Sequence, residues 1–458
     1  MIDAERVGVK RDRALDPGGF RVGSVRSDDD RVDTGSNGIE ALGGKMNQTP
    51  IGPALRPGEF VPLVALLMAL VALSIDAILP ALPVIGRDLG APRRNDVQFV
   101  VTAVLLGLGL GQIVFGPLSD RIGRKPAINT GLVLFMSGCI MSIFARTFEV
   151  MIAGRVLQGV GIAGPRIVTV ALVRDQFEGR QMARLMSFAM AVFILVPTVA
   201  PSLGLGILWL GGWRAIFVTF FIIAAVTLAW FSLRQPETLP PARRRSLSPR
   251  AIGGAVLEVL RIRAALGYTV ATGCVFAPFV AYLSSAQQIF QEAYRTGALF
   301  PAYFGVLALA FGGASLVNGW LVMKYGMRRL SRRATVSMTL VSVVAWTLAF
   351  AFEGLPPLWL FMTYLLLVFL CIGLLFGNLN ALAMEPIGHI AGVGAGVVAT
   401  LSTFISVPFG ALVGHRFDGT MYALIAAFAV FGAGTYAAMR WAEAGGGAER
   451  SRDAAARE

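Results

Sequence analysis

Twelve long apolar runs divide this chain, and they constrain its fold more than any other feature. Their centres lie near residues 70, 107, 136, 161, 194, 222, 275, 310, 343, 368, 403 and 430. About 20 apolar residues in a helix cross the hydrocarbon core of a bilayer. Because lipid offers no hydrogen bonds to the backbone, a chain crosses it as helices or as a closed barrel, and runs of this length indicate helices. We therefore expect an all-α membrane protein with twelve transmembrane helices.

The composition agrees with lipid as the solvent. Of the 458 residues, 55% are hydrophobic and 15% are charged, whereas soluble domains carry about 25% charged residues. The net charge of +13 would otherwise suggest nucleic acid, but its placement between the apolar runs argues against such a partner. Cys139, Cys274 and Cys371 fall inside apolar runs without metal-ligand spacing, so we expect them to be packing residues and expect no metal site.

The positions of Lys and Arg predict the orientation in the membrane. If the N-terminus is cytoplasmic, 31 of the 40 Lys and Arg residues fall in inward segments and seven fall in outward loops. Both termini are then cytoplasmic, and the basic face would contact anionic lipid.

Polar segments suggest how the chain is divided. We expect a disordered cytoplasmic tail, a first six-helix half, a basic cytoplasmic linker, a second six-helix half and a cytoplasmic tail, at residues 1–57, 58–233, 234–263, 264–441 and 442–458. The first tail is rich in Arg, Asp and Gly and lacks helical periodicity. Met46 opens a shorter segment directly before the first apolar run, and we expect it to be the true start.

The turn between the second and third runs reads GPLSDRIGRKP and begins at Gly116. A basic turn bracketed by glycine between two membrane-length helices indicates a tight hairpin at one bilayer face. We expect Asp120 to accept hydrogen bonds from helix N-termini and from Arg121 or Arg124. Gly116 and Gly123 would allow close backbone approach. The predicted role of this gating loop is a latch that stabilises one orientation of the halves; the alternative is an ordinary charged turn.

A weaker copy of the loop follows the eighth run. At an offset of 203, Gly319, Leu321, Lys324, Gly326 and Arg328 match Gly116, Leu118, Arg121, Gly123 and Lys125. Met323 stands where the first copy has Asp120. Parallel halves of this kind, related by an axis along the membrane normal, are typical of transporters with a substrate between them.

Charge is scarce inside the runs, where Asp76, Arg155 and Arg166 stand out. A charge near the middle of a bilayer costs about 3 kcal/mol or more on insertion scales, so each is a functional candidate. Removal from water favours the protonated form of a carboxyl group. We therefore expect Asp76 to load and release a proton; the alternative is a structural carboxylate satisfied by a neighbouring arginine.

Arg155 opens the segment RVLQGVG in the fourth run. The first and fourth helices run antiparallel, so Asp76 and Arg155 share a depth about 10 Å below the outer surface. We expect the two to face a common cavity and to attract each other. Protonation of Asp76 would weaken that attraction and act as a switch between two packings; a static buried pair is the alternative.

Further residues are candidates for the cavity wall. Arg166 lies about three helical turns beyond Arg155, so both should occupy one face, about 16 Å apart, and attract anionic or strongly dipolar solutes. Alternatively, Arg166 snorkels to the cytoplasmic edge. Gln112, Asn378 and Asn380 are possible hydrogen-bonding residues of the same cavity.

The fifth run contains VPTVAPSLG, with Pro197, Pro201 and Gly204. Proline inside a span bends the helix and frees a carbonyl group, which a rocking carrier can use; simple kink packing is the alternative. The glycines of GLGLGQ in the second run are expected to be a close-packing surface. Aromatic residues of the seventh and eighth runs could line an apolar pocket, although such residues more often face lipid or the core: Phe276, Phe279, Tyr282 and Tyr303.

The sequence lacks the motifs for ATP hydrolysis, metal binding and hydrolytic catalysis. The sequence contains no GxxxxGK[ST] phosphate-binding loop, which argues against an ATP-driven pump. His389 and His415 lack metal-ligand spacing, and no Ser/His/Asp set indicates an enzyme. We expect no cofactor.

The stretch from Asp76 to Phe217 resembles the Bcr/CflA group of drug:proton antiporters in the major facilitator superfamily. The similar pieces occur in family order: SIDAILPALP, LGLGLGQIVFGPLSDRIGRKP, RVLQGVGIAG, LVRDQF, VPTVAPSLG and GWRAIF. The second half matches best at LLFGNLNALAMEP. The resemblance implies export of small amphipathic drugs, driven by the proton gradient across the bacterial inner membrane, with Asp76 as the coupling carboxylate and Arg155 as the arginine of the fourth helix. It also implies a monomer.

The chain departs from the family pattern at three places. Ala200 and Leu205 replace the outer glycines of the fifth-helix motif, Arg166 stands one turn before the usual arginine near Val170, and Gly377 replaces a proline. The site and the substrate are therefore expected to be shifted. Export of an endogenous metabolite or its uptake by proton symport is the alternative function, and a non-transporting sensor or scaffold is a third.

Overall fold

The computed structural model describes residues 57–177, 179–244 and 249–455. The expected N-terminal tail, including Met46, lies outside these ranges except for Pro57, which begins the first helix. The described helices belong to one compact unit, Thr49–Glu458. No strand occurs within the described ranges, so the all-α prediction is confirmed.

The helices before the linker are α1 (Pro57–Asp76), η1 (Leu79–Ala81), α2 (Leu82–Asp88), η2 (Arg94–Gln98), α3 (Phe99–Ile122), α4 (Arg124–Ile143), α5 (Phe148–Gln176) and α6 (Gly179–Arg234). The linker holds η3 (Pro241–Arg243) and α7 (Pro249–Arg261). After it come α8 (Arg263–Gln287), η4 (Gln288–Ala293), η5 (Gly297–Leu299), α9 (Phe300–Tyr325), α10 (Met327–Phe350), α11 (Leu358–Met384), η6 (Glu385–Ile390), α12 (Ala391–His415) and α13 (Tyr422–Ala455).

Eleven of the described helical stretches are long and apolar enough to cross a membrane. One of them, Leu195–Arg234, is 40 residues long and belongs to α6. Gly212 interrupts this helix at φ 71° and ψ −178°, a conformation that glycine alone adopts readily. Counted as two segments, α6 brings the total to the twelve helices that the sequence predicts.

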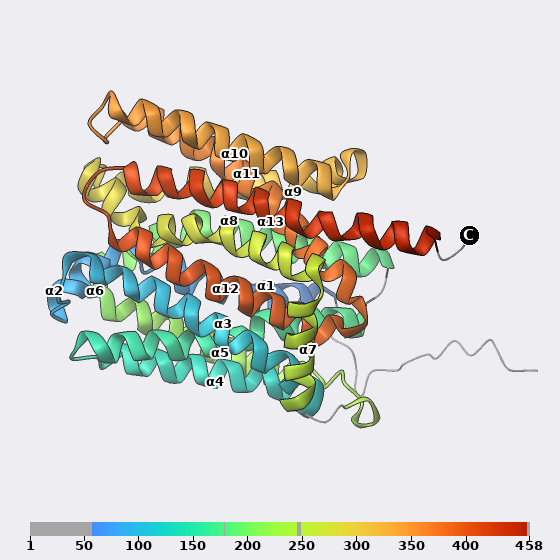
Figure 1. The fold of residues 1–458 in the computed structure, drawn as a ribbon. Helices are drawn as coiled ribbons and strands as arrows, with labels where there is room; N and C mark the ends of the chain where they lie inside the picture. Colours follow the sequence, from blue (N-terminus) through green and yellow to red (C-terminus); the bar gives the residue numbers. More distant parts are fainter. Residues whose placement is uncertain (1–56, 178, 245–248, 456–458) are drawn as a thin grey trace, which may run out of the picture. The chain divides into compact units, whose positions relative to one another are not determined.

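The helices before α7 pack mainly on one another, as do the helices after it. The two sets, here called the first and second halves, meet chiefly where α3 packs on α12 and where α6 packs on α9. The long helices lie side by side, and α7 crosses one end of them (Figure 1). We call this end, where α3 meets α4, the Gly123 end, and the opposite end, which carries η2, the Asn95 end.

Glycines set the closest of these contacts, as expected for the second run. A Cβ on Gly107 would collide with a backbone carbonyl of α5, and one on Gly109 would collide with Thr403 of α12. The hydroxyl of Thr400 donates to the Gly109 carbonyl oxygen at 2.8 Å. One glycine-rich helix therefore packs tightly against its own half and against the other half.

We had expected the first run to form one continuous helix, but α1 ends at Asp76. Pro80 follows four residues later and has no N–H to donate to the Asp76 carbonyl. The chain continues through η1 and then α2, which contains Pro83. Asp76 thus lies at a helix end and not within a regular helical turn.

Gly204 packs against this helix break. A Cβ there would collide with the backbone carbonyl of Ala77, the residue after Asp76. Pro197 and Pro201, the prolines expected to bend the fifth helix, lie inside α6, and the one non-helical residue described within this helix is Gly212. In this structure Gly204 therefore serves close packing beside Asp76.

The polar segments after each half contain more helix than the sequence indicated. Part of the expected linker forms α7, which buries Ala255 and Val259 and packs on α8 and α12. Glu258 of this helix lies 2.6 Å from the Nε2 atom of His389. The expected C-terminal tail continues α13 as far as Ala455.

The repeated loop has the same backbone in both halves. Gly123 separates α3 from α4 at φ 107° and ψ 162°, and Gly326 separates α9 from α10 at φ 76° and ψ 150°. Both conformations fall where only glycine is common. The repeat predicted from the sequence is therefore present in the backbone.

We predict that Gly204→Ala destabilises the protein while Gly206→Ala does not. The new methyl group at position 204 collides with the Ala77 carbonyl, whereas position 206 has open space. Overpacking of this kind costs about 1–3 kcal/mol. Thermal unfolding of the purified variants in detergent measures the difference, and equal melting temperatures would contradict the proposed packing.

Candidate functional site

A cavity of about 150 Å³ lies between the two halves. Residues of α1, α3, α5 and α6 line it from the first half, and residues of α8, α9 and α11 line it from the second. Asp76 and Arg166, two of the residues singled out from the sequence, both line this cavity, and so does Pro197.

Aromatic rings form the wall contributed by the second half. The phenylalanines that line the cavity are Phe276, Phe279, Phe304, Phe311, Phe369 and Phe376. Neighbouring rings lie at centroid distances of 5.0 Å for Phe276 and Phe376 and 5.8 Å for Phe279 and Phe311. Such spacing is typical of favourable aromatic pairs. The wall therefore offers ring faces and edges to an apolar or aromatic solute.

Asp76 and Arg166 face this cavity without partners. Only 5% of Asp76 is exposed, and it makes no hydrogen bond or ion pair with any residue the structure describes. Arg166, which is half-buried, likewise makes no hydrogen bond or ion pair with any residue the structure describes. Ionised groups are rarely left unpaired in an apolar setting because desolvation is costly. These two side chains are thus the strongest functional candidates of the cavity.

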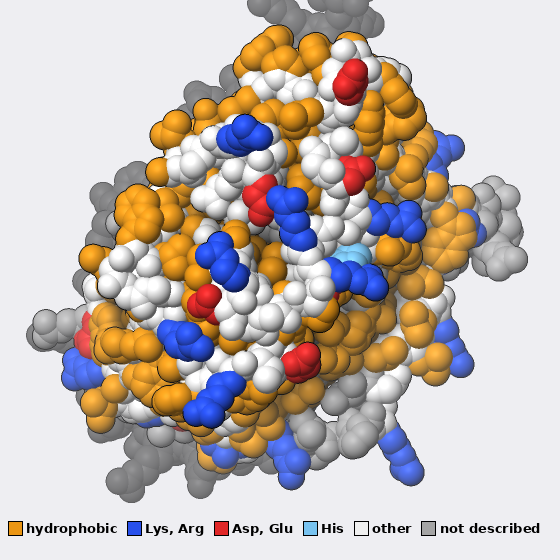
Figure 2. All heavy atoms as spheres, turned by 90° about the vertical axis from the view of Figure 1, so that its left-hand side faces the viewer, with side chains coloured by type: hydrophobic (Ala, Val, Ile, Leu, Met, Phe, Trp, Pro, Cys, Tyr) orange, Lys and Arg blue, Asp and Glu red, His pale blue; other side chains and the backbone are white. Residues whose placement is uncertain are grey.

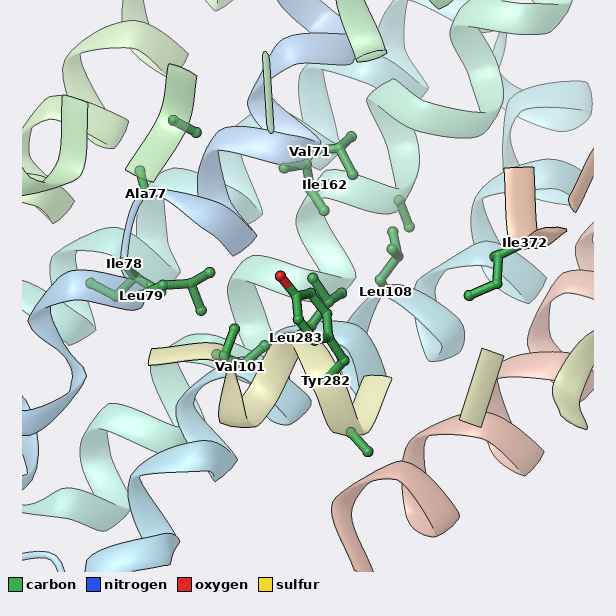
Figure 3. Close-up of a cluster of buried hydrophobic side chains, with 14 of the residues drawn as sticks. Val71, Ala77, Ile78, Leu79, Val101, Leu108, Ile162, Tyr282, Leu283 and Ile372 are labelled. Carbon is green, nitrogen blue, oxygen red and sulfur yellow. The ribbon is translucent and has the colours of Figure 1, made fainter. Parts of the chain in front are cut away.

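Tyr282 contributes a third polar group, from the second half. Its hydroxyl oxygen is buried and has no hydrogen-bond partner among the described residues, although the Asp76 carboxyl lies near enough to act on it electrostatically. Figure 3 shows this oxygen among apolar side chains that include Val71 and Leu108. The sequence placed Tyr282, Phe276 and Phe279 among possible pocket residues, and all three line the cavity.

Arg155 has a different place from the one we predicted. It is fully buried, and its guanidinium donates to the Val100 carbonyl at 2.8 Å, the Ser74 carbonyl at 2.7 Å and the Gln158 side chain at 2.7 Å. No ion pair joins it to Asp76 in the described structure, and it is not among the residues that line the cavity. The expected electrostatic pair is therefore absent here, because other acceptors already satisfy the guanidinium.

The contact of Arg155 with Ser74 nevertheless bears on Asp76. The last carbonyl groups of a helix lack intrahelical donors, and Ser74 lies two residues before the end of α1. Arg155 satisfies this carbonyl and thereby fixes the helix end that carries Asp76. Arg155 therefore contacts the helix end that carries Asp76 from outside the cavity.

The other predicted cavity residues lie elsewhere. Asn378 exchanges two hydrogen bonds of 2.9 Å with Asn318 and so joins α11 to α9. Asn380 donates to the Phe376 carbonyl of its own helix at 2.9 Å. Gln112 is buried, with its Oε1 atom unpartnered among described residues. None of the three is part of the cavity lining.

The gating loop forms a network centred on Arg124. Its side chain donates to Asp120 at 2.6 Å, to Ser119 at 2.8 Å and to Asp175 at 3.0 Å. Asp120 thus accepts from Arg124, as predicted, whereas Arg121 is exposed. Gly116 is buried, and its carbonyl accepts from the Ser119 hydroxyl.

Glu237 completes the network and was missed by the sequence analysis. Its carboxylate accepts from the backbone N–H groups of Arg124 and Lys125 at 2.9 and 3.1 Å, so it caps the N-terminus of α4. A Cβ on Gly123 would collide with this carboxylate. The network links α3, α4, α5 and the chain after α6, all in or next to the first half, so the partners of the expected latch lie within that half.

Hydrogen bonds join the two halves at the Asn95 end. Asn95 donates to the carbonyl of His415, which ends α12, and to that of Phe417 just beyond it, both at 2.8 Å. Gln98 donates to the Gly414 carbonyl at 2.9 Å. Gln288 links to both side chains, and Arg94 forms an ion pair with Glu292. Figure 2 looks onto this end and shows charges of both signs scattered among apolar side chains. Polar contacts therefore join the two halves on this side.

We predict that Arg155 and Arg166 differ in their effect on stability. Arg155→Gln should lower the free energy of unfolding by about 1–3 kcal/mol, because it leaves buried carbonyl groups unpaired. Arg166→Gln removes no hydrogen bond described here and should not lower the melting temperature. Thermal unfolding in detergent compares the two variants; equal losses would contradict the separation of roles.

Glycine-to-alanine substitutions in the two loop copies give a second comparison. Both Gly123→Ala and Gly326→Ala strain a glycine backbone by about 1–3 kcal/mol. At position 123 the methyl group also displaces the Glu237 carboxylate, whereas position 326 has open space. Gly123→Ala should therefore give the lower melting temperature, and the reverse order would rule out the capping role of Glu237.

Comparison with known proteins agrees with this architecture. The family model described as Major Facilitator Superfamily matches residues 64–411, more than half of the chain. The chain is 30% identical over 358 residues to the uncharacterized MFS-type transporter YdgK of Bacillus subtilis, covering 77% of this chain and 87% of that protein. It is 27% identical over 369 residues to the bicyclomycin resistance protein homolog of Haemophilus influenzae, covering 77% and 88%.

A solved structure shares the fold at low sequence identity. The xylose transporter XylE from E. coli, in a partially occluded inward-open conformation, matches with a TM-score of 0.65 and 13% identity, covering 84% of this chain and 96% of that one. The family match, the relatives and the twelve-helix fold agree. The chain therefore belongs to the Major Facilitator Superfamily of membrane transporters, is not an enzyme, and resembles within that superfamily the Bcr/CflA group.

Proposed function

We propose that this protein exports small amphipathic compounds across the bacterial inner membrane in exchange for protons. One observation carries the proposal: Asp76, a carboxylate without a partner among the described residues, lines an aromatic cavity between the two halves. An ionised carboxylate in such a place costs several kcal/mol unless a proton or a ligand compensates it. The site therefore suits a group that alternates between the two.

The resistance named for the Haemophilus influenzae relative supports the drug-like substrate class. The aromatic wall supports it independently, because ring faces bind apolar and aromatic surface with little demand for a particular polar pattern. The proton gradient would supply the energy, without a cofactor.

Alternating access follows from the same arrangement. The polar contacts at the Asn95 end would hold the cavity closed toward the outside, and their release would open it there. The halves would rock about the cavity, as in other transporters built from repeats. With the excess of Lys and Arg inside, the Gly123 end and both termini would be cytoplasmic. The protein would work as a monomer.

The test is the growth of an efflux-deficient bacterium that expresses this protein, across amphenicols, bicyclomycin and cationic dyes. Raised tolerance should appear with the unaltered protein and disappear with Asp76→Asn at matched membrane levels. Glu353→Gln, which changes an exposed carboxylate, serves as the control and should keep the tolerance.

The outcomes separate the candidate functions. Tolerance that Asp76→Asn leaves intact would exclude the coupling role of Asp76. A lack of protection by any variant, despite good membrane levels, would exclude drug efflux and favour transport of an endogenous metabolite.

A further inference from the structure

Two opposite charges face the same cavity and do not pair with each other. No ion pair joins Asp76 to Arg166 in the described structure, although both line the cavity. We propose that the cavity selects aromatic zwitterions, with a cationic amine held at Asp76, a carboxylate held at Arg166 and one ring between them. This substrate class rests on the proposed function, in which the cavity is the transport site.

The anionic end of the ligand is assigned by Arg166. The guanidinium carries five N–H donors in a plane, and none makes a hydrogen bond that the structure describes for this residue. A carboxylate matches two of these donors at once, which a neutral carbonyl group does less well. Because the guanidinium remains charged in proteins, this end of the site persists through the transport cycle.

The cationic end is assigned by Asp76 together with Tyr282. An ammonium group carries three donors and no acceptor. The Asp76 carboxylate and the unpartnered Tyr282 hydroxyl are acceptors from different halves of the protein. A bound amine would therefore satisfy the Asp76 carboxylate, and a turn of the Tyr282 side chain toward the cavity would bring a second acceptor to it from the other half.

The aromatic wall and the volume of the cavity determine which ring the ligand can carry. An apolar cavity of about 150 Å³ holds one benzene ring in another protein, and the present cavity has a similar volume of about 150 Å³. Phe279 is flanked by Phe311 at 5.8 Å and by Phe369 at 5.6 Å, so a ring can contact several aromatic neighbours. A single ring with short substituents fits this space.

Exchange with protons favours a zwitterion over a simple anion. An anion at Arg166 would bind better once Asp76 is protonated, since the nearby negative charge is then gone; solute and proton would travel together. A zwitterion needs the ionised carboxylate for its amine, so protonation of Asp76 weakens its binding. Among solutes that use Arg166, the zwitterion is therefore the one compatible with antiport.

The experiment measures binding of three probes with the same ring to the purified protein. The probes are para-aminomethylbenzoate, its methyl ester, which keeps only the cation, and its N-acetyl derivative, which keeps only the anion. Isothermal titration calorimetry should show the zwitterion binding about tenfold or more tightly than either single-charge probe, because each end makes a charge-assisted hydrogen bond.

Substitutions test which residue binds the carboxylate of the zwitterion and which binds its amine. Arg166→Gln should remove the advantage of the zwitterion over the ester, and Asp76→Asn should remove its advantage over the N-acetyl probe. Lowering the pH should weaken zwitterion binding to the unaltered protein and leave binding to Asp76→Asn unchanged. Arg146→Gln and Glu353→Gln, both at exposed positions, are the matched controls and should keep the preference.

Three results would overturn the proposal: equal binding of all probes, a preference that survives Arg166→Gln, or no binding of any probe to folded protein. These outcomes are separable from the proposed function. Drug tolerance that depends on Asp76, without a zwitterion preference, would reject this substrate class and leave proton-driven efflux standing. A zwitterion preference in a protein whose transport ignores Asp76→Asn would retain the site and reject the proton exchange.

Discussion

A fully buried arginine holds the first half together. Arg155 on α5 donates to the Ser74 carbonyl on α1 and to the Val100 carbonyl on α3, and through Gln158 it reaches Gly138 on α4. Four helices thus depend on one guanidinium. Its cost of burial is offset because strong acceptors surround it, including a carbonyl that the end of α1 leaves free. The position of Asp76 depends on this contact.

The cavity groups present the opposite situation. Asp76 is buried and Arg166 is half-buried, and no described protein group pairs with either. Charged groups inside a membrane are normally satisfied by an opposite charge or, as for Arg155, by carbonyl oxygens. Two such groups without partners in one cavity therefore point to a proton or a ligand as the missing partner. The same residue type would then serve two ends: a satisfied arginine supports the frame, and under the proposed substrate class an unsatisfied one would bind the ligand.

The sequence predicted the twelve helices because bilayer thickness fixes the length of an apolar run. It predicted the loop glycines because a tight turn needs their backbone freedom. It also brought Asp76 and Arg166 to notice, since charge is conspicuous among apolar residues. The place of Arg155 could not be predicted, because helical rise gives the depth of a side chain and leaves the acceptors around it unknown.

Contacts between residues distant in the sequence were also beyond reach. Nothing local marks Glu237 as the cap of α4, which begins 113 positions earlier at Arg124. The break at Asp76 could have been inferred from Pro80 and Pro83, although their effect on a buried helix depends on what packs beside it. The aromatic wall was hidden because phenylalanines that face lipid and those that face a cavity look alike in a sequence.

The capping carboxylate Glu237 has a mechanical consequence for the segment between the halves. It pins the start of that segment to α4, and the contact of Glu258 with His389 pins α7 to the second half. Twelve residue steps separate Glu237 from Pro249, where α7 begins, and a chain of that length reaches about 43 Å at most. While both contacts hold, the length of this chain segment sets an upper limit on how far the halves can separate at the Gly123 end.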